Sequence, residues 1–134
     1  MKGLHEMRII NSTLIEDKVR EMCISANCYL NPDIRAAIEN GAKNDKSEVG
    51  RTVLNKLIQN ADIAASKEVP ICQDTGMAVF FIEIGKEVFV EGDTLTDAVN
   101  KGVSRGYTDG YLRKSVVGDP LNRVNTKDNT PAVI

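Results

Sequence analysis

Residues 70–76 read PICQDTG, and the strongly apolar run MAVFFIEI follows directly at 77–84. Such a run must be buried, so the short polar stretch before it lies at the edge of a hydrophobic core. The stretch carries a thiol, an amide, a carboxylate and a hydroxyl on consecutive residues from Cys72 to Thr75. Gly76 allows the backbone to turn sharply here. Because functional side chains are often found on loops held by a rigid scaffold, this loop is the first candidate site.

Upstream of this loop, the spacing of apolar residues predicts helices over about 13–29, 32–40 and 47–66. Thr13 and Glu16 have the form of a capping box at the start of the first helix. The second helix has a proline at its first position and a glycine after its last, and both residues are favoured there. The half of the chain before the loop is therefore expected to be helical.

Downstream of the loop, the pattern changes to that of strands. Residues 77–84 and 88–90 are rich in β-branched and aromatic residues, and the turn-like Gly85 to Glu87 separates them, which predicts a hairpin over about 77–91. A further helix follows at about 94–112. The expected fold class is α+β, with the N-terminal helices packed on a small antiparallel sheet in a single domain.

The last predicted helix carries glycines at four-residue intervals, at Gly102, Gly106 and Gly110. Each glycine costs roughly 1 kcal/mol relative to alanine in a helix interior. Their spacing keeps them close to one face, where another element can approach the backbone. This face is a contact surface, either within the fold or for a docking partner.

Composition restricts the class of protein. The chain has 134 residues, 42% of them hydrophobic and 27% charged, with a formal net charge of -2 and no tryptophan. It has no basic stripe for nucleic acid and no run near the ~20 apolar residues that span a bilayer. The N-terminus lacks the apolar core of a secretory signal, and three cysteines show no disulfide spacing. We expect a cytoplasmic protein that binds neither nucleic acid nor a membrane.

The cysteines differ in what they could do. Cys23 and Cys28 are five residues apart on a predicted helix and point about 140° apart, so they are expected to be small buried hydrophobes. Cys72 lies in the polar loop, where it is either a metal ligand or a half-buried structural thiol. His5 is the only histidine and lies in the lead-in, which argues against a Ser–His or Cys–His nucleophile.

Two further features have more than one interpretation. The Asp-Thr-Gly at 74–76 is common turn chemistry and also occurs in aspartic proteases, but a helical first half does not suit an all-β protease. Four basic residues late in the chain form either a solvated rim or a site for a carboxylate substrate, since guanidinium groups bind carboxylates with two hydrogen bonds: Arg105, Arg113, Lys114 and Arg123.

Taken together, several stretches resemble one family. The stretch at 70–76, with the apolar run after it, resembles the iron–sulfur segment of class I fumarate hydratases and L-tartrate dehydratases. GYTDGYLRKSVV at 106–117 resembles the next signature of that family, and DPL at 119–121 with DNTPAVI at 128–134 resembles the third. The resemblance starts at about residue 8 and is specific in these signatures.

The resemblance implies a 4Fe–4S cluster held by three cysteines, with one iron open to act as a Lewis acid on a 2-hydroxydicarboxylate such as malate. Cys72 matches the first cluster cysteine. Gln73 and Asp74 match residues that contact substrate, and Arg113 matches an arginine that binds a substrate carboxylate. The other two cysteines and the proton-transfer groups lie beyond residue 134 in the family, so no catalytic residue is assigned here.

By the same resemblance, the chain corresponds to the N-terminal part of an α-subunit or α-region. Its implied partners are the rest of that region and a β-subunit or β-region, within a homo-oligomeric complete enzyme. The apolar, strand-like ending also favours a cut inside a larger protein, and we expect the piece to be inactive alone. The sequence departs from the family pattern at Gly118, Val124 and Lys127, and it does not decide whether the substrate is fumarate or tartrate. The alternative function is a non-catalytic docking or assembly module.

Overall fold

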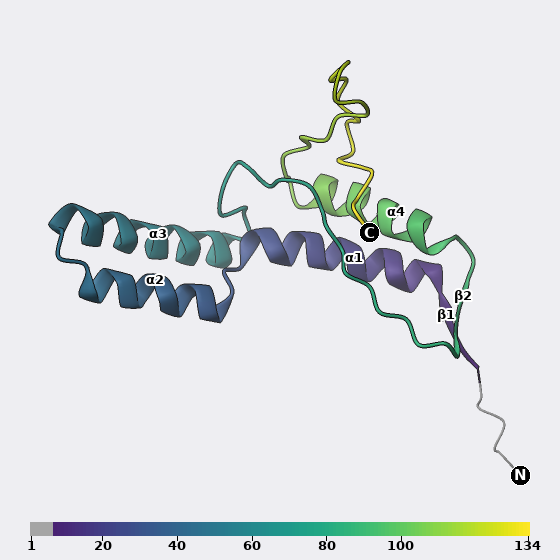
Figure 1. The fold of residues 1–134 in the computed structure, drawn as a ribbon, viewed down its shortest axis with the longest axis horizontal. Coiled ribbons are helices and arrows are strands. Elements are labelled where there is room, and N and C mark those ends of the chain that lie inside the picture. Colours follow the sequence, from purple (N-terminus) through teal and green to yellow (C-terminus); the bar gives the residue numbers. More distant parts are fainter. Residues whose placement is uncertain (1–6) are drawn as a thin grey trace, which may run out of the picture.

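The computed structural model describes residues 7–134, so His5 lies outside the described residues. Helices and short strands make up an α+β fold, as predicted, and their arrangement is shown in Figure 1. In chain order the elements are β1 Arg8–Asn11, α1 Ser12–Cys28, α2 Pro32–Asn44, α3 Glu48–Lys67, β2 Val88–Glu91 and α4 Leu95–Asp109.

The hydrophobic core lies between α1 and α4, which run side by side (Figure 1). Apolar side chains at helical spacing on both helices face each other there, as their sequence pattern predicts. Ala78 and Phe80, from the apolar run after the candidate loop, pack against this cluster. Its buried members are Val19, Cys23, Val99, Val103, Tyr107 and Leu112.

Glycines allow α1 and α4 to approach closely. A Cβ added to Gly102 would lie 2.6 Å from the Glu16 carbonyl oxygen and 2.6 Å from Val19 Cβ. One added to Gly106 would lie 2.8 Å from Cys23 Cβ. The predicted close approach at this face is confirmed. Because α1 already covers the face, it is not free for another protein, and the docking alternative loses that surface.

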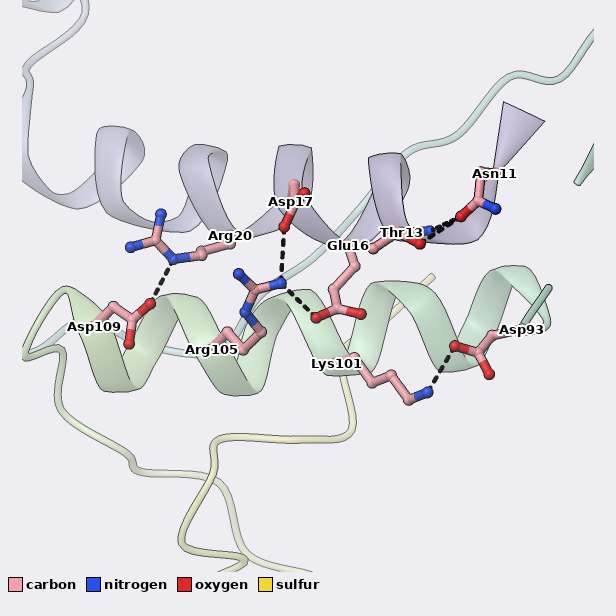
Figure 2. A network of polar contacts seen from close by, with 9 residues as sticks. All are labelled: Asn11, Thr13, Glu16, Asp17, Arg20, Asp93, Lys101, Arg105 and Asp109. Atoms are coloured by element: carbon pink, nitrogen blue, oxygen red, sulfur yellow. Dashed lines mark hydrogen bonds and ion pairs between the residues drawn. The ribbon is translucent and has the colours of Figure 1, made fainter. Parts of the chain in front are cut away.

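Ion pairs join the same two helices along their polar side (Figure 2). The Arg105 guanidinium lies 2.5 Å from a Glu16 carboxylate oxygen and 2.8 Å from one of Asp17. Arg20 pairs with Asp109 at 2.5 Å. Arg105 is therefore paired with carboxylates of α1. Of the four late basic residues considered for a substrate carboxylate, this one is not available.

The small sheet is parallel, and the predicted antiparallel hairpin over 77–91 is wrong. β2 pairs with β1 in the register that sets Ile9 opposite Phe89. The first half of the predicted hairpin is extended but forms one isolated bridge within the described chain, between Val79 and Val133. The reason is helix packing: β1 leads into α1 and β2 leads toward α4, and since these helices lie side by side, the strands before them align. The expected burial of the whole run 77–84 is also wrong, because only Ala78 and Phe80 pack against the core and Phe81 is 97% exposed.

Three helix boundaries also differ from the prediction, one of which is the end of α4 at Asp109, three residues before the expected end at about 112. Asn11 caps α1 in place of Thr13, because its side-chain oxygen accepts a hydrogen bond from the Thr13 amide at 2.9 Å. The second helix, α2, continues past Gly41 to Asn44. A Cβ at Gly41 would lie 3.3 Å from a methyl carbon of Leu54 in α3, so this glycine is used for helix contact.

The pair α2 and α3 forms an antiparallel hairpin that projects from the α1–α4 pair (Figure 1). Small buried residues, among them Ala42, Ala61 and Ala64, let these helices pack closely. Arg35 of α2 also pairs with Asp62 of α3 at 2.6 Å, and the pKa of that carboxyl is lowered by the hydrogen bond from Arg35. Within residues 7–134, no helix has the length and hydropathy that crossing a bilayer requires.

Candidate functional site

The candidate loop follows the end of α3 and is anchored at its start by Ile71. The Ile71 amide donates a hydrogen bond to the Asn27 carbonyl oxygen of α1 at 2.9 Å. The Asn60 side chain of α3 donates to the Ile71 carbonyl oxygen at 2.8 Å. Both backbone groups of Ile71 are thus satisfied by neighbouring helices, so the residue before Cys72 has a fixed position.

The next three side chains, those of Cys72, Gln73 and Asp74, are exposed to solvent. The Asp74 amide donates a long hydrogen bond to the Cys72 sulfur at 3.5 Å. Gly76 has φ +60°, in the left-handed region that glycine adopts without strain. The loop therefore presents a thiol, an amide and a carboxylate side by side on a tightly turned backbone.

The far end of the loop is held by Tyr107 of α4. The buried Tyr107 hydroxyl donates to the Thr75 carbonyl oxygen at 2.9 Å. Burial raises the pKa of this hydroxyl, so it keeps its proton and remains a donor at neutral pH. The Thr75 hydroxyl in turn donates to the Arg113 carbonyl oxygen at 3.0 Å, which joins the loop to the segment that carries Arg113.

Asn129 links the same two segments through its side chain. It is fully buried, and its oxygen accepts hydrogen bonds from the Ser115 amide at 2.7 Å and the Val116 amide at 3.0 Å. Its side-chain nitrogen donates to the Gly76 carbonyl oxygen at 3.0 Å. One amide thus ties the end of the Cys72 loop to the residues just after Arg113, although the two are far apart in sequence.

Tyr107 and Asn129 were not predicted as functional residues, although both lie in stretches that resemble the family signatures. Tyr107 follows Gly106 in α4, and Asn129 lies in the polar run 125–130, so neither has a distinguishing local signal. The backbone groups that they contact could not be predicted from the sequence, because those partners lie at least 13 residues away along the chain.

The guanidinium of Arg113 is available for a ligand. Its residue is exposed, and no carboxylate in the described part of the chain forms an ion pair with it, in contrast to Arg20 and Arg105. Arg123 lies in the excursion at 117–125, which projects away from the helices (Figure 1). Of the late basic residues, Arg113 is thus the one joined by hydrogen bonds to the Cys72 loop.

The three cysteines divide as predicted from their positions. Cys23 and Cys28 are buried in the fold, and burial raises the pKa of the Cys23 thiol to about 11, so it stays protonated and is a poor ligand. Cys72 is exposed. Within residues 7–134, no three His, Cys, Asp or Glu side chains lie close enough to hold a metal ion. The loop therefore offers one thiol ligand, and a complete metal centre needs others.

Comparison with known proteins adds to this geometry. A family model described as fumarate hydratase matches residues 16–134. A putative L(+)-tartrate dehydratase subunit alpha from Methanocaldococcus jannaschii is 36% identical over 116 residues, which is 86% of this chain and 40% of that protein. The anaerobic class I fumarate hydratase of Escherichia coli is 35% identical over 92 residues, which is 67% of this chain and 17% of the relative. Fumarate hydratase 2 of Leishmania major is 35% identical over 100 residues, which is 73% of this chain and 17% of that protein.

Proposed function

The chain belongs to the fumarate hydratase family, and from this premise we propose that it forms one wall of an iron–sulfur site at which a 2-hydroxydicarboxylate is reversibly dehydrated. It spans 40% of the tartrate dehydratase subunit and 17% of the class I fumarate hydratase, so the reaction belongs to a longer protein. The observation that carries the proposal is the direct joining of the Cys72 loop to the Arg113 segment by Thr75 and Asn129.

In this proposal, Cys72 is one of three thiolate ligands of a 4Fe–4S cluster, and the other two come from residues outside this sequence. The exposed thiol fits the role, because it is accessible and its sulfur already accepts an amide hydrogen bond from Asp74. When bound, the cluster supplies a Lewis-acidic iron for the hydroxyl and carboxylate of the substrate.

The residues of this chain would bind and orient the substrate. The free Arg113 guanidinium would bind one substrate carboxylate with two parallel hydrogen bonds. Gln73 and Asp74, next to Cys72, would contact the substrate beside the cluster, the amide as donor or acceptor and the carboxylate as acceptor. Fixing these groups on one hydrogen-bonded framework lowers the cost of ordering the substrate.

We propose malate and fumarate as the substrate pair, with L-tartrate as the alternative. Relatives named for both activities match this chain with similar identity, 36% and 35%, so the identities do not separate the two. The proton-transfer groups would come from the rest of the α-region, and a β-subunit or β-region would complete a homo-oligomeric enzyme in the cytoplasm. Kinetics of the complete protein on malate and on tartrate would decide the substrate.

Cys72→Ser in the complete protein tests the site. After anaerobic reconstitution with iron and sulfide, we expect the variant to lose the visible absorbance of the cluster together with fumarate hydration. The matched control is Cys23→Ala, which removes a buried cysteine of α1 and should keep both properties. A Cys72→Ser protein that retains the cluster and full turnover would show that this loop is not the cluster site.

A further inference from the structure

The extended segment 77–84 has an unused capacity for β-pairing. The Phe80 amide donates to the Val133 carbonyl oxygen at 2.8 Å, and the Val133 amide donates to the Ala78 carbonyl oxygen at 3.0 Å. Within the described chain, these are the only backbone–backbone hydrogen bonds that the segment makes. Since an unpaired strand edge readily adds another strand, the segment is a template for one.

The side of the segment that faces Val133 has a defined set of free groups. In a parallel ladder, alternate residues of a strand bond to the same neighbour. Because the Phe80 amide already faces Val133, the next groups on this edge are the Phe80 carbonyl and the amide and carbonyl of Ile82. The groups of Phe81 face the opposite edge. The pairing that Val133 begins could therefore continue through Ile82.

An apolar groove lies between this segment and α1. Its volume is about 1180 Å³, and both the helix and the segment line it. Large apolar side chains there remain open to solvent: Leu14 is 61% exposed, Met22 43% and Ile82 41%. Segment 77–84 therefore has apolar surroundings that suit a paired strand with apolar side chains.

We infer that this edge is covered by the residues that follow Ile134 in the complete hydro-lyase, as a strand that continues from Val133 alongside Phe80 and Ile82. This inference rests on the proposed function, in which this sequence is the first part of a longer protein. The tartrate dehydratase relative, of which 40% is covered, has ample further chain to supply such a strand. A strand already begun in register also needs no second molecule, so its pairing carries no association entropy.

Such a strand would act on the site itself. Segment 77–84 begins immediately after Gly76, and the strand containing Val133 begins shortly after Asn129. Pairing them over a greater length would fix both sides of the hydrogen bond between Asn129 and Gly76. The sheet would then support the framework that holds Cys72 near Arg113.

Hydrogen–deuterium exchange on the complete protein tests the inference, with the Phe81 amide of the opposite edge as the internal reference. We expect the Ile82 amide to exchange at least about tenfold more slowly than the Phe81 amide. Equal rates at the two amides would overturn the inference. Protection of Ile82 that disappears on dilution would also overturn it, because a second copy would then be the occupant.

A pair of proline variants of the complete protein separates the two edges. Ile82→Pro removes the amide that the continued strand needs, whereas Phe81→Pro removes a neighbouring amide of the other edge. We expect the first to lower the melting temperature more than the second, and an equal or reversed order would overturn the inference. Neither experiment uses hydratase activity, so a protein without activity but with a protected Ile82 would refute only the proposed function.

Discussion

At the scale of single residues, Asn129 shows how one buried amide can hold a site together. Its three hydrogen bonds join two loops that carry the candidate ligands. Asn129→Ala would leave the Ser115 and Val116 amides without a partner, and the Gly76 carbonyl would keep only the Tyr107 hydroxyl, at 3.3 Å. We expect the free energy of unfolding in urea to fall by about 3 kcal/mol, because buried polar groups that lose their partner keep their desolvation cost.

The control for this variant is Asn122→Ala, at an exposed position in the excursion at 117–125. Its side chain makes no hydrogen bond within the described chain, so we expect a change of no more than about 0.5 kcal/mol. A value that small for Asn129→Ala as well would show that water or a rearranged loop replaces the buried amide, and that the two loops are held by other contacts.

Burial of Cys23 makes stability depend on pH. Burial raises the pKa of this thiol from its ordinary 9.0 to about 11, so the folded protein holds the proton more tightly than the unfolded chain does. This stabilisation is present in full below pH 9.0 and is lost as pH rises toward 11, a total of about 3 kcal/mol. Cys28, whose pKa is raised by burial and then by Glu68, acts in the same direction.

We therefore expect the free energy of unfolding to decrease as the pH rises above 9.0, and Cys23→Ala to weaken that decrease. Urea titrations of both proteins at matched pH values measure the difference. Parallel pH profiles for the wild type and Cys23→Ala would mean that the thiol ionises without resistance in the folded state.

At the scale of elements, the contact of α1 with α4 depends on missing side chains. Gly102→Ala would gain roughly 1 kcal/mol in helix propensity, but its Cβ would lie 2.6 Å from a carbonyl oxygen of α1. We expect the steric clash to outweigh the gain in helix propensity. The free energy of unfolding, measured by heat or urea, should fall by about 2 kcal/mol.

Gly118→Ala is the matched control for this variant, because an added Cβ there meets nothing closer than 3.8 Å. It should change stability by no more than about 0.5 kcal/mol. A neutral or stabilised Gly102→Ala protein would show that α1 and α4 can separate at little cost.

The elements also show where local sequence logic applies and where it ends. Capping residues and apolar spacing predicted both ends of α3 and the start of α4 to within about one residue, because those signals act over a few positions. The hairpin failed because β2 has Ile9 and its neighbours as partners, about 80 residues earlier, and nothing local to 77–91 specifies them. The Gly41 stop failed because contact with Leu54 outweighs the intrinsic preference of glycine for helix ends.

The candidate site divides in the same way. The loop at 70–76 could be picked out from residue types alone, since a thiol, an amide and a carboxylate before a strongly apolar run form an unusual combination. The roles of Tyr107 and Asn129 could not, because they consist of hydrogen bonds to backbone atoms of other segments. The assignments of Cys72, Gln73, Asp74 and Arg113 as cluster and substrate ligands stay predictions.

At the scale of the whole molecule, the number of accessible thiols limits what this chain can do alone. Cys23 and Cys28 are buried, and Cys72 is exposed. Since the proposed cluster needs three thiolates, we expect residues 1–134 to form no stable cluster and to show no malate dehydration after anaerobic reconstitution. Absorbance spectra and a fumarate assay check this, with the complete protein as positive control. Turnover by the 134-residue chain would overturn the three-cysteine requirement.

The side-by-side packing of α1 and α4 also has a consequence for how the chain reaches its fold. The Arg20–Asp109 ion pair joins residues 89 positions apart, and the bond from Asp93 to Ser12 joins residues 81 apart. Closing a loop of that size costs entropy before any contact repays it, whereas α2 and α3 meet across a short turn. During synthesis, we therefore expect the apolar face of α1 to stay uncovered until α4 has also left the ribosome. The α2–α3 hairpin can form as soon as its own two helices have been made.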